Sequence, residues 1–302
     1  MIVMSYHNSV LLKETVDGLN IRPDGTYVDI TYGGGGHSQE ILNRLGSKGR
    51  LFAFDQDKDA QQNVIEDHRL SLIPENFRFI KRFLRLYDIK QVDGILGDFG
   101  VSSYQFDQPE RGFSTRFESK LDMRMNQQHA LSAIEVLNSY EETALRNMFF
   151  QYGELRNAPK LARTIVTARK VQPIETSTQL KQVLQPFLPS HKEHKILAQI
   201  FQAIRIEVNQ ELEVLKEFLE QTKGLVKQGG RLSLISYHSL EDRLVKRFIR
   251  SGLFEGEPEK DIYGNSSVPF KKVGGLIIPD IKEIENNNRA RSAKLRIAER
   301  LA

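Results

Sequence analysis

The sequence contains no cysteine among its 302 residues. Disulfide bonds, thiolate zinc sites and iron–sulfur clusters are therefore excluded. No apolar run is long enough to span a membrane, and the first ten residues lack the basic-then-apolar pattern of a signal peptide. His191 and His194 have the spacing of metal ligands, but no carboxylate pattern accompanies them. We therefore expect a cytoplasmic protein that binds neither a membrane nor a metal.

The charge balance is mildly basic, with a formal net charge of +4 and a pI near 9.1. This balance permits a polyanionic partner but does not establish one. Apolar residues make up 39% of the chain and charged residues 27%, as in ordinary soluble enzymes. A chain of 302 residues has room for one large domain or two modest ones.

A glycine run between two strand-like segments is the most informative local pattern. Tyr27–Thr31 is rich in the β-branched and aromatic residues that strands favour, and Gly33–Gly36 follows almost at once. The next residues have helical spacing up to Gly46. Leu51–Phe54 is apolar enough for a strand buried on both faces, and Asp55 stands at its end. The pattern predicts a strand–turn–helix–strand unit of a parallel sheet.

This unit is typical of a nucleotide-type binding site. Glycines let the backbone approach a ligand closely, and the helix that follows points free N–H groups at an anion. An acidic residue at the end of the second strand accepts hydrogen bonds from ribose hydroxyls. The NAD pattern G-x-G-x-x-G does not fit, because the sixth position counted from Gly33 is Ser38. S-adenosylmethionine also offers ribose hydroxyls and a carboxylate, and it requires no such spacing.

Two further strands are expected before residue 105. Phe77–Ile80 reads as a third strand, with Phe83 in the loop after it, where the ring is either a core aromatic or a stacking partner for adenine. Gln91–Phe99 reads as a fourth strand that ends in Asp98. Since ligands bind at the carboxyl ends of strands in open α/β sheets, Asp98 is a site candidate, with a helix N-cap as the alternative.

The rhythm of the sequence changes from Gln105 to about Ile206, where helical spacing replaces strand patterns. We expect an inserted all-helical domain there. The predicted division is 1–105 for the first part of the core, 106–206 for the insertion and 207–302 for the second part of the core. The expected fold class is α/β, with a Rossmann-like core.

Strand and helix patterns return after the insertion. Glu211–Lys227 is amphipathic and is expected to end at Gly229 and Gly230. Arg231–Tyr237 alternates as a strand, and a helix follows that Gly252 can end. Gly256–Asn288 is rich in turn residues and is expected to be a loop with one hairpin. The alternating tail from Ala293 onward predicts a last strand.

The segment VDITYGGGGHS resembles the first motif of the ribosomal RNA small subunit methyltransferase H family, and the resemblance extends over nearly the whole chain. It includes His7 near the N-terminus and seven blocks in the family's order. The later blocks are RGFS at Arg111–Ser114, LDMRMN at Leu121–Asn126, YGE at Tyr152–Glu154, FQAIRIEVNQEL at Phe201–Leu212, SYHSLEDRLVKRF at Ser236–Phe248 and RARSAKLRIAER at Arg289–Arg300.

The resemblance implies that the α/β core is a Rossmann-like class I methyltransferase core with an inserted all-helical domain. It also implies an enzyme that uses S-adenosylmethionine to methylate the N4 amine of a cytidine in the decoding region of small-subunit (16S) ribosomal RNA. The absence of cysteine agrees with a nitrogen or oxygen acceptor, because carbon-5 methylation of pyrimidines normally uses a thiol nucleophile. The implied substrate is the RNA in an assembled or near-assembled small subunit, and a homodimer is possible. The implied cofactor contacts are Gly34, Gly35, Gly36, His37, Asp55, Phe83, Asp98 and Gln105.

Three stretches depart from the family pattern. Glu118–Lys120 replaces an Asp-Gly-Pro, and Asn126 ends the following block in place of an aspartate. His194–Gln202 replaces the family's H-P-A-T-R-T-F-Q, and Tyr104 stands where proline is common. The first two departures fall in the inserted region, so they bear on RNA contacts more than on cofactor binding.

The residues that would touch the RNA follow from base-flipping chemistry. A flipped base is held by aromatic or arginine planes, and the backbone is held by cations. The candidates are Arg111, Phe113, Arg116, Arg124, His238, Arg289 and Arg291. His238 is alternatively the cap of the next helix. Asp98, or a backbone carbonyl near it, is the candidate acceptor for the N–H of the amine.

Three functions remain open on the residues alone. The first is the RNA cytidine methyltransferase, or an enzyme of the same fold that acts on another nucleic-acid amine. The second is an NAD-dependent oxidoreductase, which the glycine spacing disfavours. The third is a nucleic-acid-binding module without activity, which the intact Asp55 and Asp98 disfavour.

Overall fold

The computed structural model describes residues 9–259, 263 and 266–301. His7 lies outside the described residues. The chain forms two compact units, and we refer to Met1–Gly100 with Leu212–Ala302 as the core unit and to Val101–Glu211 as the helical unit. The divisions thus fall after residues 100 and 211, whereas the predicted ones fall after 105 and 206.

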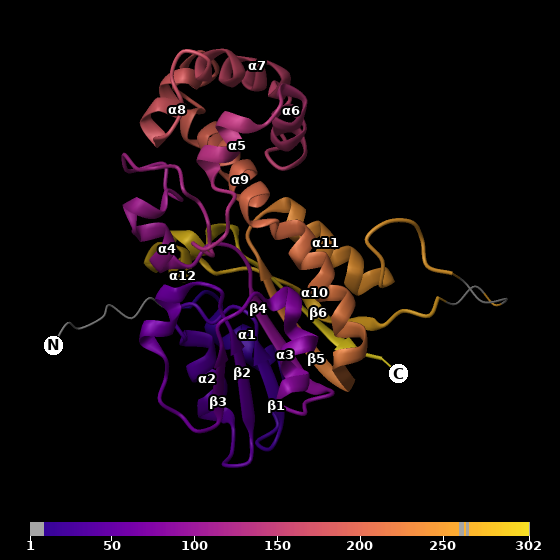
Figure 1. Cartoon of the computed structure of the whole chain (residues 1–302). Coiled ribbons are helices and arrows are strands. Elements are labelled where there is room, and N and C mark those ends of the chain that lie inside the picture. The colour runs from indigo at the N-terminus through magenta and orange to yellow at the C-terminus, as the bar shows by residue number, and fades with distance from the viewer. Residues whose placement is uncertain (1–8, 260–262, 264–265, 302) are drawn as a thin grey trace. The chain divides into compact units, whose positions relative to one another are not determined.

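The core unit contains a seven-stranded sheet in the order β3-β2-β1-β4-β5-β7-β6 (Figure 1). The first five strands of this order are parallel, and β7 pairs antiparallel to both β5 and β6. The strand order reverses between β1 and β4, which is where open α/β sheets bind ligands. The strands are β1 (Thr26–Asp29), β2 (Arg50–Phe54), β3 (Leu70–Ile73), β4 (Val92–Asp98), β5 (Val226–Ser236), β6 (Phe270–Ile277) and β7 (Lys294–Arg300).

Helices cover both faces of this sheet. One apolar cluster joins α1 and α2 to the sheet through residues such as Val16, Ile41 and Leu96. The other joins α3, α10 and α11 to the opposite faces of the same strands through Leu84, Phe218 and similar residues. The helices of this unit are α1 (Leu12–Gly18), α2 (Gly36–Arg44), α3 (Ile80–Leu86), α10 (Glu211–Leu225), α11 (Ser239–Ser251) and α12 (Ile281–Asn286). The core is therefore a Rossmann-like, doubly wound α/β fold, as predicted.

The helical unit has a separate apolar core of its own, built on residues such as Val136, Phe149, Leu161 and Ile204. Its helices are α4 (Ser103–Asp107), α5 (Ala133–Ser139), α6 (Glu142–Gln151), α7 (Ala158–Arg169), α8 (Ser177–Leu184) and α9 (Glu193–Asn209). Regular pairing between strands is absent from the described part of this unit, apart from one isolated bridge between Lys120 and Thr176.

The predicted third strand is wrong. Residues 77–79 form a short 3₁₀ helix that continues into α3, and the third strand is Leu70–Ile73. The apolar side chains at Phe77, Ile80 and Leu84 all contact the same core cluster, and their spacing is helical rather than alternating. Phe83 accordingly lies inside α3, not in a loop after a strand.

The predicted role of Gly229 and Gly230 as a helix stop is also wrong. Helix α10 ends at Leu225, and β5 begins at Val226 and passes through both glycines. The register between β4 and β5 shifts at this point, because Val92 pairs with Val226 but Gly94 pairs with Arg231. Gly229 has a φ of 74°, a conformation that suits glycine, so the pair forms a wide bulge instead of a cap.

The segment Gly256–Asn288 is more regular than the turn-rich sequence indicated. Its described residues include strand β6, which forms the edge of the sheet, and helix α12. The predicted last strand is present as β7, with α11 ending at Gly252 as expected. Among the described residues, every helix is too short or too polar to traverse a lipid bilayer.

Candidate active site

The turn after β1 is held by an aspartate that sequence reasoning did not select. Asp29 is fully buried, and its carboxylate accepts hydrogen bonds from Ser38 Oγ at 2.7 Å and from the Thr31 N–H at 3.0 Å. Burial raises the pKa of Asp29, although His37 and Ser38 act in the opposite direction. The signal in the sequence is an acid at the end of an apolar strand, four residues before Gly33. Asp29 fastens the start of α2 to the end of β1.

The glycine turn leaves its main chain accessible. Gly33 and Gly35 have φ values of 52° and 78°. A Cβ on Gly35 would lie 2.8 Å from the Tyr32 hydroxyl, whereas a Cβ on Gly34 would meet nothing within 4 Å. Helix α2 begins at Gly36, so its first N–H groups face the same turn. These features give an open cradle with the partial positive charge of a helix start, which fits a carboxylate.

Asp55 directly follows β2, as the sequence indicated. One carboxylate oxygen accepts the Gly33 N–H at 2.8 Å, and the other accepts the Asp57 N–H at 2.9 Å. Burial raises the pKa of Asp55 to about 6, and these backbone hydrogen bonds act against the rise. Each carboxylate oxygen has a second lone pair, so Asp55 can still accept a hydroxyl. The ribose of a bound nucleoside fits this position.

Asp98 ends β4, on the other side of the point where the strand order reverses. Its Oδ1 accepts the Tyr237 hydroxyl at 2.7 Å, and its N–H donates to Thr31 Oγ1 at 2.7 Å. Its Oδ2 lies 3.9 Å from His37 Nδ1, and its side chain is 22% exposed. Burial raises the pKa of Asp98 to about 6, while His37 and Tyr237 favour the ionised form. Asp98 is thus a partly accessible carboxylate near its titration point at neutral pH.

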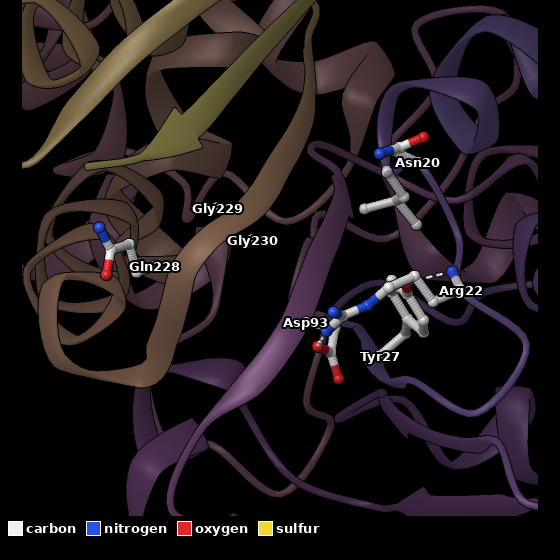
Figure 2. Close-up of a pocket in the computed structure, with 8 residues that line it drawn as sticks. Asn20, Arg22, Tyr27, Asp93, Gln228, Gly229 and Gly230 are labelled. Atoms are coloured by element: carbon white, nitrogen blue, oxygen red, sulfur yellow. Dashed lines mark hydrogen bonds and ion pairs between the residues drawn. The ribbon is translucent and has the colours of Figure 1, made fainter. Parts of the chain in front are cut away.

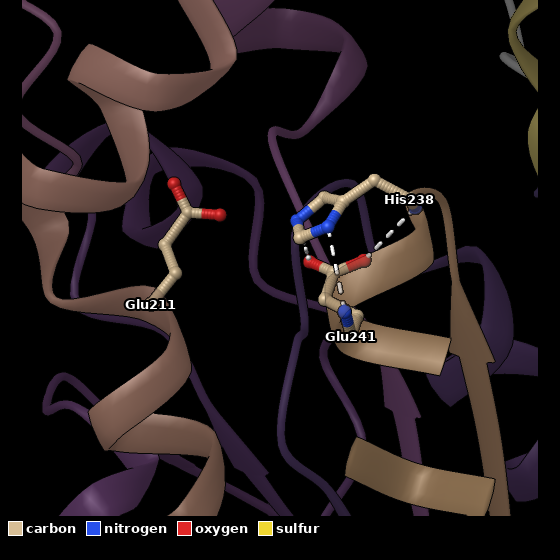
Figure 3. Close-up of side chains that lie close together, drawn as sticks. All are labelled: Glu211, His238 and Glu241. Carbon is tan, nitrogen blue, oxygen red and sulfur yellow. Dashed lines mark hydrogen bonds and ion pairs between the residues drawn. The ribbon is translucent and has the colours of Figure 1, made fainter. Parts of the chain in front are cut away.

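His238 caps helix α11, which confirms one of the two roles considered for it. Its Nδ1 accepts the Glu241 N–H at 3.4 Å, and its Nε2 lies 3.1 Å from Glu241 Oε1 (Figure 3). Glu241 is buried and its Oε2 also accepts the Tyr237 N–H at 2.9 Å. The capping arrangement therefore holds the segment that carries Tyr237.

Two of the implied cofactor contacts have other partners in this structure. Phe83 is half-buried in α3, and its ring meets that of Phe54 edge-on, with centroids 6.5 Å apart. Gln105 belongs to the helical unit, where it forms a reciprocal capping pair with Ser102 at the start of α4.

The arginines expected to hold RNA differ in their surroundings. Arg111 is buried, and it donates to the carbonyls of Arg124 and Met125 while its guanidinium lies 5.9 Å from the centre of the Phe113 ring. Phe113 is itself part of the core of the helical unit. Arg124 forms a two-point ion pair with Asp122, at 2.8 and 2.7 Å. These three side chains support the loop between α4 and α5.

The remaining candidates have more accessible side chains. Arg116 is exposed in the helical unit, and Arg291 is exposed in the 3₁₀ turn Asn288–Ser292 of the core unit. Arg289 lies in the same turn and is half-buried. The structure thus brings Asp55, Asp98, His37 and the glycine turn to one edge of the sheet, together with Asp29.

The chain matches the model of the MraW methylase family over residues 4–301. It is 72% identical to the ribosomal RNA small subunit methyltransferase H of Christiangramia forsetii, with 100% of each chain covered. It is 68% identical to the protein of the same name in Flavobacterium johnsoniae, with 99% of each covered. The corresponding protein of Bacteroides thetaiotaomicron is 54% identical, with 98% of each covered. These relatives match the chain from end to end.

Proposed function

Since this chain belongs to the MraW methylase family, we propose that it transfers the methyl group of S-adenosylmethionine to the N4 amine of a cytidine in small-subunit (16S) ribosomal RNA. The name shared by the relatives supports small-subunit ribosomal RNA as the substrate. The observation that carries the chemistry is Asp98, an accessible carboxylate with a pKa of about 6 at the point where the strand order reverses. The choice of the N4 amine rests on the family resemblance and on the absence of a thiol nucleophile.

The residues at this edge fit S-adenosylmethionine. The carboxylate of the cofactor matches the N–H groups of Gly34, Gly36 and His37, whereas the Gly35 N–H donates to the Tyr32 carbonyl at 2.7 Å. The ribose hydroxyls match the acceptor oxygens of Asp55. Phe83 and Asp98 complete the proposed contacts of the core unit. When bound, this cofactor supplies a methyl group on a positively charged sulfur.

The enzyme needs little covalent chemistry of its own. It must hold the acceptor nitrogen close to the methyl group, in line with the leaving sulfur. The lone pair of a cytosine amine is delocalised into the ring, so a hydrogen-bond acceptor on its N–H makes the nitrogen a better nucleophile. We propose Asp98 as that acceptor, because its Oδ2 has no hydrogen-bond donor closer than the 3.9 Å contact to His37 among the described residues.

The RNA is proposed to contact the exposed cations first. Arg116 and Arg291 are exposed and suited to phosphates, whereas Arg111, Phe113 and Arg124 would shape the surface of the helical unit from within. Arg289 and His238 remain candidates at the core unit. Replacing Arg116 by alanine should weaken RNA binding and reduce its salt dependence by roughly one counterion. The substrate is proposed to be the assembled or near-assembled small subunit in the cytoplasm; a homodimer remains an expectation.

The decisive experiment is mass spectrometry of nucleosides from 16S ribosomal RNA in cells that lack the gene. Loss of N4-methylcytidine, restored by the wild-type gene, is the expected result. An unchanged N4-methylcytidine pool would remove the N4 assignment and favour another nucleic-acid amine. A calorimetric titration with S-adenosylhomocysteine and with NADH separates the methyltransferase from an oxidoreductase of the same fold.

A further inference from the structure

We propose that Tyr237 is a positioning residue for methyl transfer, which holds one oxygen of Asp98 so that the other faces the acceptor amine. This role rests on the proposed function, and it assigns a part in methyl transfer to a residue outside the proposed cofactor and RNA contacts. The Tyr237 hydroxyl donates to Asp98 Oδ1 at 2.7 Å, and the two residues lie at the ends of the neighbouring strands β5 and β4. Asp98 Oδ2 is left as the proton acceptor.

The main chain of Tyr237 is held independently of its hydroxyl. Its N–H donates to Oε2 of the buried Glu241 at 2.9 Å, and the same oxygen lies at 3.4 Å from the His238 N–H. Its ring packs over Gly100, where a Cβ would lie 3.6 Å from the ring. Glu241 and Gly100 therefore fix where the ring lies, and the hydroxyl is free to act on Asp98 alone.

The Tyr237 hydroxyl can act only as a donor to Asp98. Burial raises the pKa of Tyr237 well above its ordinary value, and the charge of Asp98 raises it further. The phenol therefore keeps its proton throughout the pH range of an enzyme assay. A permanent donor on Oδ1 stabilises the ionised carboxylate and fixes its plane.

The second oxygen of Asp98 has no hydrogen-bond donor within reach among the described residues. His37 Nε2 lies 3.1 Å from the carbonyl oxygen of Val10, and a carbonyl can only accept, so this nitrogen carries a hydrogen. The other nitrogen, Nδ1, lies 3.9 Å from Asp98 Oδ2, which is beyond hydrogen-bond distance. The two oxygens of Asp98 are thus made unequal by their neighbours.

The difference between the two oxygens of Asp98 determines which of them takes the proton of the methylated amine. The lone pair of the N4 amine forms the new N–CH₃ bond while the S–CH₃ bond breaks and its electron pair stays on sulfur. The methylated amine, now positively charged, loses one proton to Asp98 Oδ2. The neutral acid then releases that proton to solvent, to which Asp98 is partly exposed.

The test compares two tyrosines of the core unit. Tyr237→Phe removes the donor to Asp98. Tyr27→Phe is the matched control, because Tyr27 is buried and its hydroxyl also makes one hydrogen bond, with the Arg22 N–H at 2.7 Å (Figure 2). Tyr27 lies in β1, six residues before Gly33. Among the described residues, its hydroxyl makes no hydrogen bond with Asp98 or His37.

For Tyr237→Phe we expect the acidic limb of the kcat–pH profile to move up by about one unit. On the alkaline plateau kcat should fall by about tenfold, because the orientation of Asp98 is lost. The Kd for S-adenosylhomocysteine should change little. The carbon-13 carboxyl resonance of Asp98 should titrate at higher pH by the same shift. Asp29 and Glu241, which also act on Asp98 electrostatically, are unchanged in the variant.

Tyr27→Phe should leave the kcat–pH profile and the Asp98 titration as in the wild type. A second variant carries 3-fluorotyrosine at position 237, a stronger donor of nearly the same size, and its acidic limb should move down. If Tyr237→Phe retains the wild-type limb and the wild-type Asp98 titration, the positioning role is refuted while methylation stands. If the wild type makes no N4-methylcytidine in 16S ribosomal RNA, the proposed function itself fails.

Discussion

Strand β4 carries an aspartate near each end, and the surroundings of the two shift their pKa values in opposite directions. Asp93, at the amino end, accepts the Thr26 N–H at 2.8 Å and Lys227 Nζ at 2.9 Å, and it is paired with Arg22 (Figure 2). Burial alone would raise the pKa of Asp93, but these partners together hold it below its ordinary value. Asp98, at the carboxyl end, has no arginine or lysine partner among the described residues, and its pKa is raised to about 6.

The contrast separates a structural carboxylate from a reactive one. Asp93 connects β4 to the bulge of β5 through Lys227 and to the turn before β1 through Arg22. The negative charge of Asp93 is therefore neutralised by cations that belong to the fold. Asp98 keeps a charge that the fold does not neutralise, beside Asp29 and Asp55, whose pKa values are also raised. Uncompensated buried charge lowers stability, so its presence at the ligand edge of the sheet indicates function.

The largest expected effect comes from neutralising the reactive aspartate. Asp98→Asn should lower kcat by roughly 10²–10³-fold, the usual contribution of a positioned proton acceptor. Asparagine is isosteric and can still accept the Tyr237 hydroxyl, so the fold should persist. Single-turnover kinetics at saturating S-adenosylmethionine give the rate of the chemical step. Full turnover with normal cofactor binding would show that Asp98 is not the acceptor.

The sequence alone indicates the functional aspartate at the carboxyl end of β4, but not the structural aspartate at its amino end. The sequence indicates Asp98 because it ends an apolar strand, and ligands bind at the carboxyl ends of strands in open α/β sheets. Asp93 gave no such signal, since its partners Arg22 and Lys227 are distant in sequence and their proximity depends on the bulge of β5. The bulge was itself misread, because a glycine pair ends a helix as readily as it distorts a strand.

The other misreadings have a similar cause. The third strand is predicted at Phe77–Ile80 because residues 77–83 have four apolar or aromatic positions, and their spacing fits both the alternation of a strand and the period of a helix. Arg111 and Phe113 were expected at the RNA because arginine and aromatic residues bind bases, yet the structure buries both. Residue type indicates chemistry, and only the fold decides which side chains remain accessible.

The matched asparagine variants should shift stability in opposite directions. Asp93→Asn removes the charge that Arg22 and Lys227 contact, and it should lower the free energy of unfolding by about 1–3 kcal/mol. Asp98→Asn removes a charge that the fold does not neutralise, so it should leave stability unchanged or raise it. Urea unfolding at pH 7 measures both. Equal losses of stability in the two variants would contradict the contrast drawn between the ends of β4.

The variant Asp55→Ala tests whether the Asp55 carboxylate binds the cofactor. The variant should lose about 1–3 kcal/mol of affinity for S-adenosylhomocysteine, the cost of leaving buried hydroxyls without an acceptor. Calorimetry measures the change directly. Asp57→Ala is the control, because Asp57 is a neighbouring buried acid that lies outside the proposed contacts. An equal loss in the control would mean that the segment after β2, rather than the Asp55 carboxylate, supports binding.

The smallest expected effect is on the pH dependence of stability. The pKa of Asp98 rises from 3.8 to about 6 on folding, so between these values the folded state binds more protons than the unfolded state. The free energy of unfolding should therefore fall as pH rises through this window, with Asp55 acting in the same direction. Asp98→Asn should make the fall shallower by up to about 1 kcal/mol per pH unit.

Asp93 acts oppositely, because its lowered pKa gives stability above pH 4 that is lost only on further acidification. Urea unfolding from pH 3 to 7 resolves the two windows, and a wild-type slope retained in Asp98→Asn would assign the titration to Asp29 or Asp55 instead.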